Sequence, residues 1–392
     1  MSMLRVIGVV LIVVSQWAWA QGEPLLVEKQ RFAFANYTTE SGVTLPEVQV
    51  GWESYGTLNE AKDNVILITH FFSGTSHAAG KYSADDALPG YWDAIIGPGK
   101  AIDTNKFFVI SSDTLVNANW HDKNVITTGP ASINPKTGKP YGLDFPVVTI
   151  GDFVEVQKRL LDSLGIEKLH AVIGASMGSF QALEWSVRYP DKVERLVHVI
   201  GAAKMDAWTV PALEKWALPI RLDANWNNGN YYEGDRPLAG VTATMLNITQ
   251  DAMHPESYKA SFPNFKVQDE GAKKDIRTLP AINQTLHERA LARAQTQDAN
   301  HILYLVRASQ LYSAGMQEDL NAAAQKVQAK VLLMPASNDL LLRPGPVHAF
   351  AKLLKEQEKD VKIEEIEGIW GHLDGIFSIQ TKAQVITEFL AE

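Results

Sequence analysis

The sequence predicts an α/β protein in which a mostly parallel sheet is flanked by helices and interrupted by a helical insertion. Short apolar runs that suit buried strands recur along the chain, at residues 65–69, 107–111, 169–173, 193–200, 331–335 and 361–366. Helical periodicity follows several of these runs, at residues 152–164, 177–187, 347–356 and 381–390. Alternation of strands and helices is typical of a parallel sheet that is covered on both faces.

The first twenty residues differ from the rest and predict a secretory signal peptide. Arg5 precedes an apolar run at residues 6–14, and Ala18 and Ala20 form an A-x-A end. This pattern is typical of a cleaved leader, and the apolar run is too short to span a bilayer. We expect cleavage after Ala20, no stable membrane insertion of the mature chain, and export to a bacterial periplasm. An uncleaved anchor is the alternative interpretation.

Composition narrows the possible partners and cofactors. The formal net charge is −9 and no basic stripe is present, so we expect no nucleic-acid partner. The chain has no cysteine, so no disulfide or thiol nucleophile is available. His70 and His77 occur in no metal-binding spacing, and we interpret them as hydrogen-bonding loop residues. We therefore expect neither a metal nor another cofactor.

The first predicted strands lead to a loop of functional interest. Residues 25–55 alternate apolar and polar around a turn signal at 40–42, which predicts an antiparallel pair at a sheet edge. The loop at 70–77 then leaves the carboxyl end of a buried strand, where open α/β sheets place their sites. We predict that Phe72, or else Phe71, contributes a backbone N–H to an oxyanion hole. Pocket wall is the alternative role for both residues.

The strand predicted at residues 107–111 is followed by a long loop. Residues 117–146 are rich in Gly, Pro, Asn and Thr, and long loops beside a site commonly carry function. A helix is predicted at residues 152–164, and Gly165 is a suitable residue to end it.

The most informative segment joins the strand predicted at residues 169–173 to a helix. Residues 174–178 read Gly-Ala-Ser-Met-Gly, which fits G-x-S-x-G, and apolar residues follow at helical spacing. A strand, a tight turn with Ser176 at its tip and a helix together form the context of a nucleophile elbow. We predict that Ser176 is a catalytic nucleophile and that the N–H of Met177 faces an oxyanion. An ordinary Gly-rich turn is the alternative.

Strand signals disappear from residue 204 to residue 323, and helical patterns such as 286–294 and 302–312 replace them. A helical insertion after a core strand would lie above Ser176 as a lid. The chain is thus predicted to divide into a signal peptide (1–20), a first core part (21–203), the lid insertion (204–323) and a second core part (324–392).

A serine nucleophile requires a base and an orienting acid, and in α/β-hydrolases the chain order is Ser, acid, His. Asp339 and His372 follow two of the last predicted strands, so both should lie beside the elbow. His348 falls inside a predicted helix, and Asp374 is too close in sequence to His372 to orient it. We predict Asp339 as the acid and His372 as the base; a helix N-cap is the alternative for Asp339.

The predicted triad implies acyl transfer through an acyl-serine. His372 would deprotonate Ser176, which would attack the carbonyl of a small acyl substrate, and Asp339 would stabilise the imidazolium. If water is the second nucleophile, the enzyme is a hydrolase; if an alcohol or amine is, it is a transferase. The triad does not distinguish these two outcomes.

The sequence resembles the homoserine O-acetyltransferases of the α/β-hydrolase superfamily. The resemblance spans most of the mature chain and rests on the motifs at residues 55–59, 76–80, 96–103, 129–134, 137–141 and 181–185. It implies the triad Ser176, Asp339 and His372, a lid that includes residues 223–232, and a homodimer. It also implies that Arg221 holds the carboxylate of an amino-acid substrate, for which a guanidinium fork is suited. A salt bridge within the lid is the alternative for Arg221.

The chain also departs from this family pattern. Phe71 and Phe72 replace small residues, and Leu373 separates His372 from Asp374, where the family usually has the acid next to the histidine. In the family that acid is thought to bind the homoserine amine, so Asp374 is a candidate substrate ligand. We expect an exported, esterase-like hydrolase of small acyl compounds. The alternatives are a genuine O-acetyltransferase that uses acetyl-CoA and a non-catalytic binding protein on a hydrolase scaffold.

Overall fold

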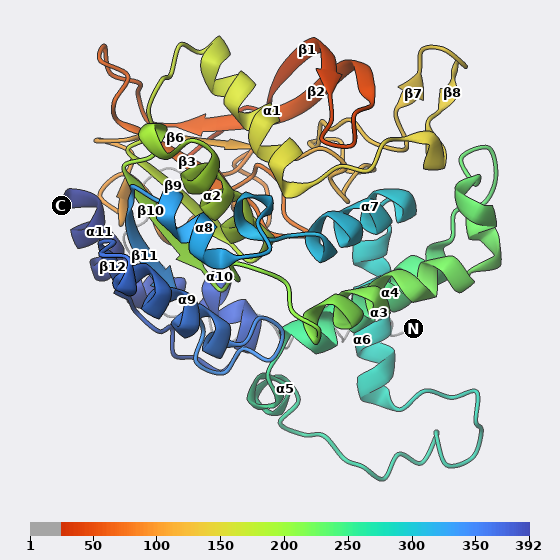
Figure 1. Ribbon diagram of the computed structural model, residues 1–392. Coiled ribbons are helices and arrows are strands. Elements are labelled where there is room, and N and C mark those ends of the chain that lie inside the picture. Colours follow the sequence, from red (N-terminus) through yellow and green to blue (C-terminus); the bar gives the residue numbers. More distant parts are fainter. Residues whose placement is uncertain (1–24) are drawn as a thin grey trace.

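The computed structural model describes residues 25–392, and its centre is one eight-stranded sheet (Figure 1). The predicted signal peptide at residues 1–20 lies outside the described residues. Within the described part, no helix is long and apolar enough to cross a membrane. The strands occur in the spatial order β1 (Gln30–Thr38), β2 (Thr44–Tyr55), β6 (Phe108–Ser112), β3 (Val65–Thr69), β9 (Ala171–Ala175), β10 (Arg195–Val199), β11 (Lys330–Met334) and β12 (Val361–Ile363).

The directions of the strands confirm the predicted mostly parallel sheet. β1 and β2 form an antiparallel pair at one edge, and β2 is also antiparallel to β6. All pairs from β6 to β12 are parallel. The carboxyl ends of these six strands therefore lie along one edge of the sheet, which is where α/β proteins place their ligands.

Two apolar layers cover the sheet, because successive residues of each strand point to opposite faces. Leu67 and Val172 contribute to the layer that contains α1, α2, α8 and α9, whereas Ile66 and Ile173 contribute to the layer that contains α11. The helices of these layers are α1 (Ile150–Ser163), α2 (Met177–Arg188), α8 (Leu320–Lys326), α9 (Pro344–Glu356) and α11 (Ala383–Ala391). Thr149 begins α1 with a capping box that it forms with Asp152.

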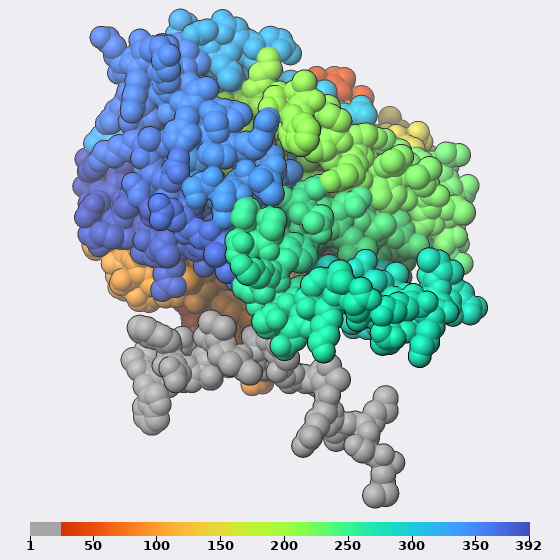
Figure 2. All heavy atoms as spheres, turned by 90° about the horizontal axis from the view of Figure 1, so that it is seen from below, coloured from red at the N-terminus to blue at the C-terminus, as the bar shows by residue number. Residues whose placement is uncertain are grey.

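The segment between β10 and β11 is helical, as the loss of strand signals predicts. The helices that precede α8 in this segment are α3 (Thr209–Leu222), α4 (Leu238–Ala252), α5 (Pro255–Ser261), α6 (Ala281–Ala294) and α7 (Ala299–Gln310). Figure 1 shows α3, α4 and α6 gathered to one side of the sheet, and Figure 2 shows the insertion beside the C-terminal part of the chain. Trp216, Met245 and Ile302 join it to the same apolar layer as α2. The insertion is therefore packed against the core.

Candidate active site

The turn between β9 and α2 holds Ser176 in a strained backbone conformation. Ser176 has φ 56° and ψ −123°, although it is not glycine. Its glycine neighbours allow the strand and helix to approach closely, because a Cβ at Gly174 or Gly178 would collide with backbone atoms or with Thr69. The G-x-S-x-G pattern thus has a steric cause, and the turn presents the serine hydroxyl at the carboxyl edge of the sheet.

Three predicted residues meet at this turn through a continuous chain of hydrogen bonds. Ser176 Oγ lies 2.8 Å from His372 Nε2, and His372 Nδ1 lies 2.6 Å from Asp339 Oδ2. The other oxygen of Asp339 accepts the amides of Leu341 (2.8 Å) and Leu342 (2.9 Å). The side chain of Asp339 therefore contacts the histidine with one oxygen and stabilises the turn that follows it with the other. His348 is not part of this group: it is exposed on α9 and pairs with Glu365.

Asp374, a candidate substrate ligand, does not line the cavity beside Ser176. It is fully buried, and one of its carboxylate oxygens accepts the amides of Trp370 (3.1 Å) and Gly371 (3.0 Å). The hydroxyl of Ser378 donates to the other oxygen. Its prediction as a substrate ligand is thus not met by the geometry, because both oxygens are used in holding the loop that carries His372.

Two residues beside Ser176 have backbone amides without a hydrogen-bond acceptor among the described residues. Phe72 and Met177 line the same small recess as the serine, and their amide N–H groups donate to no acceptor within residues 25–392. The preceding turn is closed by a hydrogen bond from the amide of Gly74 to the carbonyl of Phe71 (2.9 Å). Phe72 packs edge-on against Trp216, which fixes this loop against the insertion. The arrangement suits a pair of oxyanion donors.

Buried polar contacts of two histidines hold this loop in place. His70 is completely buried, and its Nε2 accepts the amide of Thr114 (3.2 Å). Burial lowers the pKa of His70, because its charged form would be desolvated. His70 and His77 act as loop hydrogen-bonding residues, as predicted: Nδ1 of His70 lies 2.8 Å from the carbonyl oxygen of Phe71, and Nδ1 of His77 lies 3.1 Å from Glu53.

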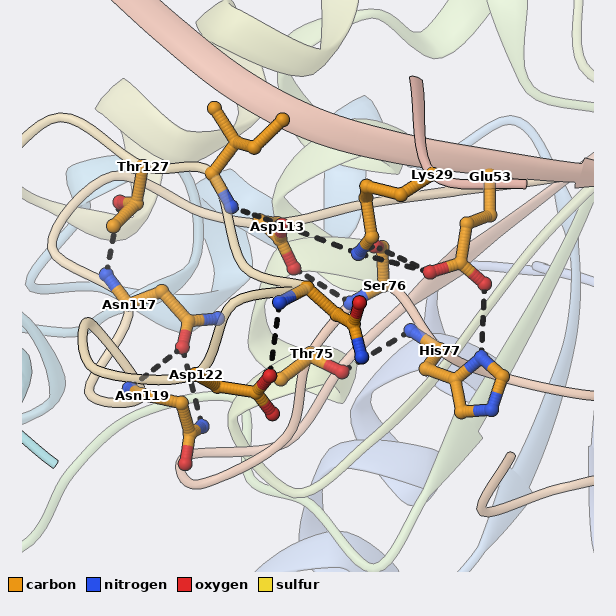
Figure 3. A network of polar contacts seen from close by, with 12 residues as sticks. Lys29, Glu53, Thr75, Ser76, His77, Asp113, Asn117, Asn119, Asp122 and Thr127 are labelled. Carbon is orange, nitrogen blue, oxygen red and sulfur yellow. Dashed lines mark hydrogen bonds and ion pairs between the residues drawn. The ribbon is translucent and has the colours of Figure 1, made fainter. Parts of the chain in front are cut away.

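Figure 3 shows the charged network at the end of the loop. Lys29 lies between two buried carboxylates, 2.8 Å from Glu53 and 3.4 Å from Asp113. Asp113 also accepts the amide of Ser76 (2.8 Å). Burial raises the pKa of Glu53, but the hydrogen bond from His77 and the charge of Lys29 outweigh it and lower this pKa to about 2. The sequence analysis did not identify this network, because its residues are far apart in the sequence and come together only in the folded chain.

A cavity of about 110 Å³ opens beside Ser176 and His372. Its walls are mostly apolar, and they include Phe71, Phe72, Ile200, Trp216, Leu373 and Ile376. Phe71 thus lies in the pocket wall, as the alternative prediction for it stated. A second recess of about 20 Å³ lies beside Met177 and is lined by Phe180, Leu213 and Leu341 among others. The serine therefore has one larger and one smaller space beside it.

Arg221 does not reach the cavity, and the prediction that it holds a substrate carboxylate is not met. Adjacent residues of a helix point in different directions: Ile220 of α3 is buried in the core, whereas Arg221 is exposed and pairs with Glu214. The alternative prediction, a salt bridge within the insertion, matches this geometry. A different arginine, Arg293 at the end of α6, lines the cavity.

No cluster of potential metal ligands occurs among residues 25–392. The site is built instead from a serine, an imidazole, a carboxylate and two backbone amides, and such a set can perform acyl transfer without any added group.

Comparison with known proteins agrees with this fold. Residues 97–377 match the family model of the alpha/beta hydrolase fold. A solved structure of esterase E22 is 54% identical with a TM-score of 0.91, and the match covers 93% of this chain and all of that one. The homoserine O-acetyltransferase of Bacillus anthracis is 39% identical with a TM-score of 0.90, and the match covers 94% and 98% of the two chains.

The protein is thus an α/β-hydrolase-fold enzyme of the acyl hydrolase and acyltransferase class. The homoserine O-acetyltransferase of Solidesulfovibrio magneticus is 37% identical over 355 residues, which make up 88% of each chain. The chain therefore belongs to the homoserine O-acetyltransferase family, as its motifs predict.

Proposed function

We propose that this chain is an exported serine esterase that hydrolyses small acyl esters. The observation that carries the proposal is the hydrogen-bonded chain from Ser176 Oγ through His372 to Asp339 (2.8 and 2.6 Å) at the edge of an apolar cavity. Export is proposed from the leader pattern that ends at Ala20.

The proposed mechanism follows from these positions. His372 Nε2 takes the proton of Ser176 as the hydroxyl oxygen attacks the ester carbonyl, and Asp339 stabilises the imidazolium. The amides of Phe72 and Met177 stabilise the oxyanion of the tetrahedral intermediate. His372 then returns the proton to the departing alcohol, which leaves an acyl-serine. Water attacks this acyl group with His372 again as base, so the products are the free acid and the unmodified serine.

Hydrolysis is favoured over transfer by the residues next to His372. Leu373 lines the cavity, where it offers no partner to a charged amine. Asp374, the acid that an amino-acid acceptor would need, is occupied by the amides of Trp370 and Gly371. The similar structure at 54% identity is that of a protein named an esterase. A small acyl group suits the recess of about 20 Å³ beside Met177.

A genuine homoserine O-acetyltransferase is the second candidate, because relatives at 37% and 39% identity carry that name. It would take the acetyl group from acetyl-CoA, which is a cytoplasmic metabolite, so it fits an exported chain poorly. A non-catalytic binding protein is the third candidate. It fits poorly with a serine, histidine and aspartate that are all present and hydrogen-bonded.

The deciding experiment follows the acyl group. The mature protein from Gln21 is mixed with p-nitrophenyl acetate, with and without excess homoserine or serine, and the products are identified by mass spectrometry. Ser176→Ala is the control. Free acetate alone, unchanged by either acceptor and absent with Ser176→Ala, is expected. Acetyl groups on the acceptor hydroxyl would establish a transferase, and no product from either route would favour a binding protein.

Export has its own test. The full chain is expressed in a bacterial host, and the product is fractionated and its intact mass measured. A periplasmic protein that begins at Gln21 is expected, whereas a full-length cytoplasmic product would contradict export. Substitution of Ala20 by lysine should block cleavage, because leader peptidases require a small residue there.

A further inference from the structure

Arg293 is a largely buried cation beside the proposed nucleophile. It lies in the last turn of α6 and lines the same cavity as Ser176. Within residues 25–392, its guanidinium donates two hydrogen bonds, to Ser73 Oγ (3.3 Å) and to Thr249 Oγ1 (3.2 Å). Both acceptors are neutral hydroxyls. Neither contact neutralises the charge.

No carboxylate among the described residues compensates this charge. Burial lowers the pKa of Arg293, and no ionised neighbour acts against that effect. A guanidinium has five N–H donors and remains protonated in proteins, so its burial without an anion is unfavourable. Arg221 and Arg188 differ from Arg293 in this respect, since the charge of each is compensated by an ion pair with a glutamate. The counterion of Arg293 is therefore expected to come with the ligand.

The cavity limits the kind of anion. None of its lining residues is Asp or Glu, and Arg293 is the one permanently charged group among them. A single guanidinium fork matches the two oxygens of a carboxylate. A phosphate dianion would leave charge unpaired here, and an amino acid would bring an ammonium with no acidic partner in the cavity.

We propose that Arg293 binds the carboxylate of the alcohol portion of the substrate, which makes the substrate an O-acyl ester of a small hydroxy acid. This inference rests on the proposed esterase function. The acyl group occupies the small recess beside Met177, and the hydroxy acid occupies the larger cavity, with its carboxylate on the guanidinium. The reaction is the ester hydrolysis described above, and its products are the free hydroxy acid and the short-chain acid.

The test compares 2-acetoxypropionate with 2-acetoxypropionamide, which has the same shape and no charge. Arg293→Gln should lower kcat/KM for the carboxylate about 10- to 100-fold, the loss of one charge-assisted hydrogen-bond pair, and change the amide less than about threefold. Arg293→Lys should recover part of the loss, since it keeps the charge but not the fork. Arg289→Gln is the matched control, because Arg289 is exposed one turn earlier on α6.

Equal losses on both esters would overturn the inference and leave Arg293 as a structural link between the insertion and the loop at Ser73. The same holds if the wild-type enzyme shows no preference for the charged ester. If Arg293→Gln does not fold, the inference is tested by inhibition of the wild-type enzyme with p-nitrophenyl acetate as substrate. We expect 2-hydroxypropionate to inhibit this hydrolysis competitively and 2-hydroxypropionamide not to inhibit it. Failure of the esterase function itself is recognised separately, because the wild-type enzyme would then release no acetate from any of the three esters.

Discussion

His372 Nδ1 lies 2.6 Å from Oδ2 of Asp339, and the second oxygen of Asp339 accepts the amides of Leu341 and Leu342. These two backbone amides hold the carboxylate of Asp339 in place, independently of its contact with the imidazole. This contact selects the tautomer of His372 that carries the proton on Nδ1. Nε2 is then free to accept the proton of Ser176, 2.8 Å away.

Asp339→Asn should separate this orienting role from folding. The amide oxygen of Asn can still accept the amides of Leu341 and Leu342, so its NH₂ group faces His372 and favours the wrong tautomer. We expect kcat for p-nitrophenyl acetate to fall about 10⁴-fold, the scale known for the same change in serine proteases. The melting temperature should change little. A loss below tenfold would show that Asp339 does not orient the base.

Asp374→Ala should destabilise the loop that carries His372. The substitution leaves the buried amide of Gly371 and the half-buried amide of Trp370 without an acceptor, which costs about 2–4 kcal/mol in the free energy of unfolding. Urea denaturation measures this loss, and Asp360→Ala at an exposed site is the control. We expect kcat to fall as His372 loses its support. Unchanged stability together with a raised KM would instead restore Asp374 as a substrate ligand.

Lys29→Met should show that the charged network beneath the loop at residues 70–77 is structural. Removal of the cation leaves Glu53 and Asp113 buried without it, and breaking a buried pair costs about 3–5 kcal/mol. Arg31→Met is the matched control, because its ion pair with Glu47 is exposed and should contribute about 0–1 kcal/mol. Equal effects of the two substitutions on the free energy of unfolding would contradict the role given to Lys29.

His198 should make stability depend on pH. Burial in β10 lowers its pKa from 6.5 to about 4, so below pH 6.5 the unfolded chain binds a proton that the folded chain does not. Stability is therefore present above pH 6.5 and lost as the pH falls towards 4, by about 3 kcal/mol for this group. Urea denaturation at each pH measures it, and His198→Asn should flatten the profile. An identical profile in the variant would refute the assignment.

Leu373→Asp should test why the chain favours water as the second nucleophile. The substitution puts a carboxylate on the cavity wall, at the position next to the histidine where the family usually has its acid. We expect the ratio of acetyl transfer to homoserine over hydrolysis to rise about tenfold, the scale of one hydrogen bond to a charged group. Leu373→Asn is the uncharged control. A ratio that rises equally in both variants would exclude charge as the cause.

The parallel part of the sheet could be predicted because most of its strands are continuous apolar runs. The runs at residues 65–69 and 331–335 correspond to β3 and β11, and the G-x-S-x-G pattern identified the turn at Ser176. Asp339 and His372 could be selected because each follows a strand in the chain order that this fold uses. These signals are local in sequence or depend only on the order of the elements.

The ligand contacts could not be predicted in the same way. Whether Arg221 or Arg293 reaches the cavity depends on how α3 and α6 are rotated against the core, which a sequence pattern does not specify. The sequence left Asp374 as a candidate substrate ligand, because nothing in the pattern shows that its carboxylate accepts backbone amides. Those hydrogen bonds depend on the turn at Gly371, where φ is 70°. The network around Lys29 joins residues up to 84 positions apart.

The central claim is that Ser176 is the nucleophile activated by His372, and a fluorophosphonate tests it most directly. The mature protein is labelled, its intact mass is measured, and the modified residue is located by peptide mapping. We predict one adduct per chain, on Ser176, with no labelling of Ser176→Ala and labelling at least about 100-fold slower in His372→Gln. An adduct on another residue, or an unlabelled wild-type protein, would contradict the claim.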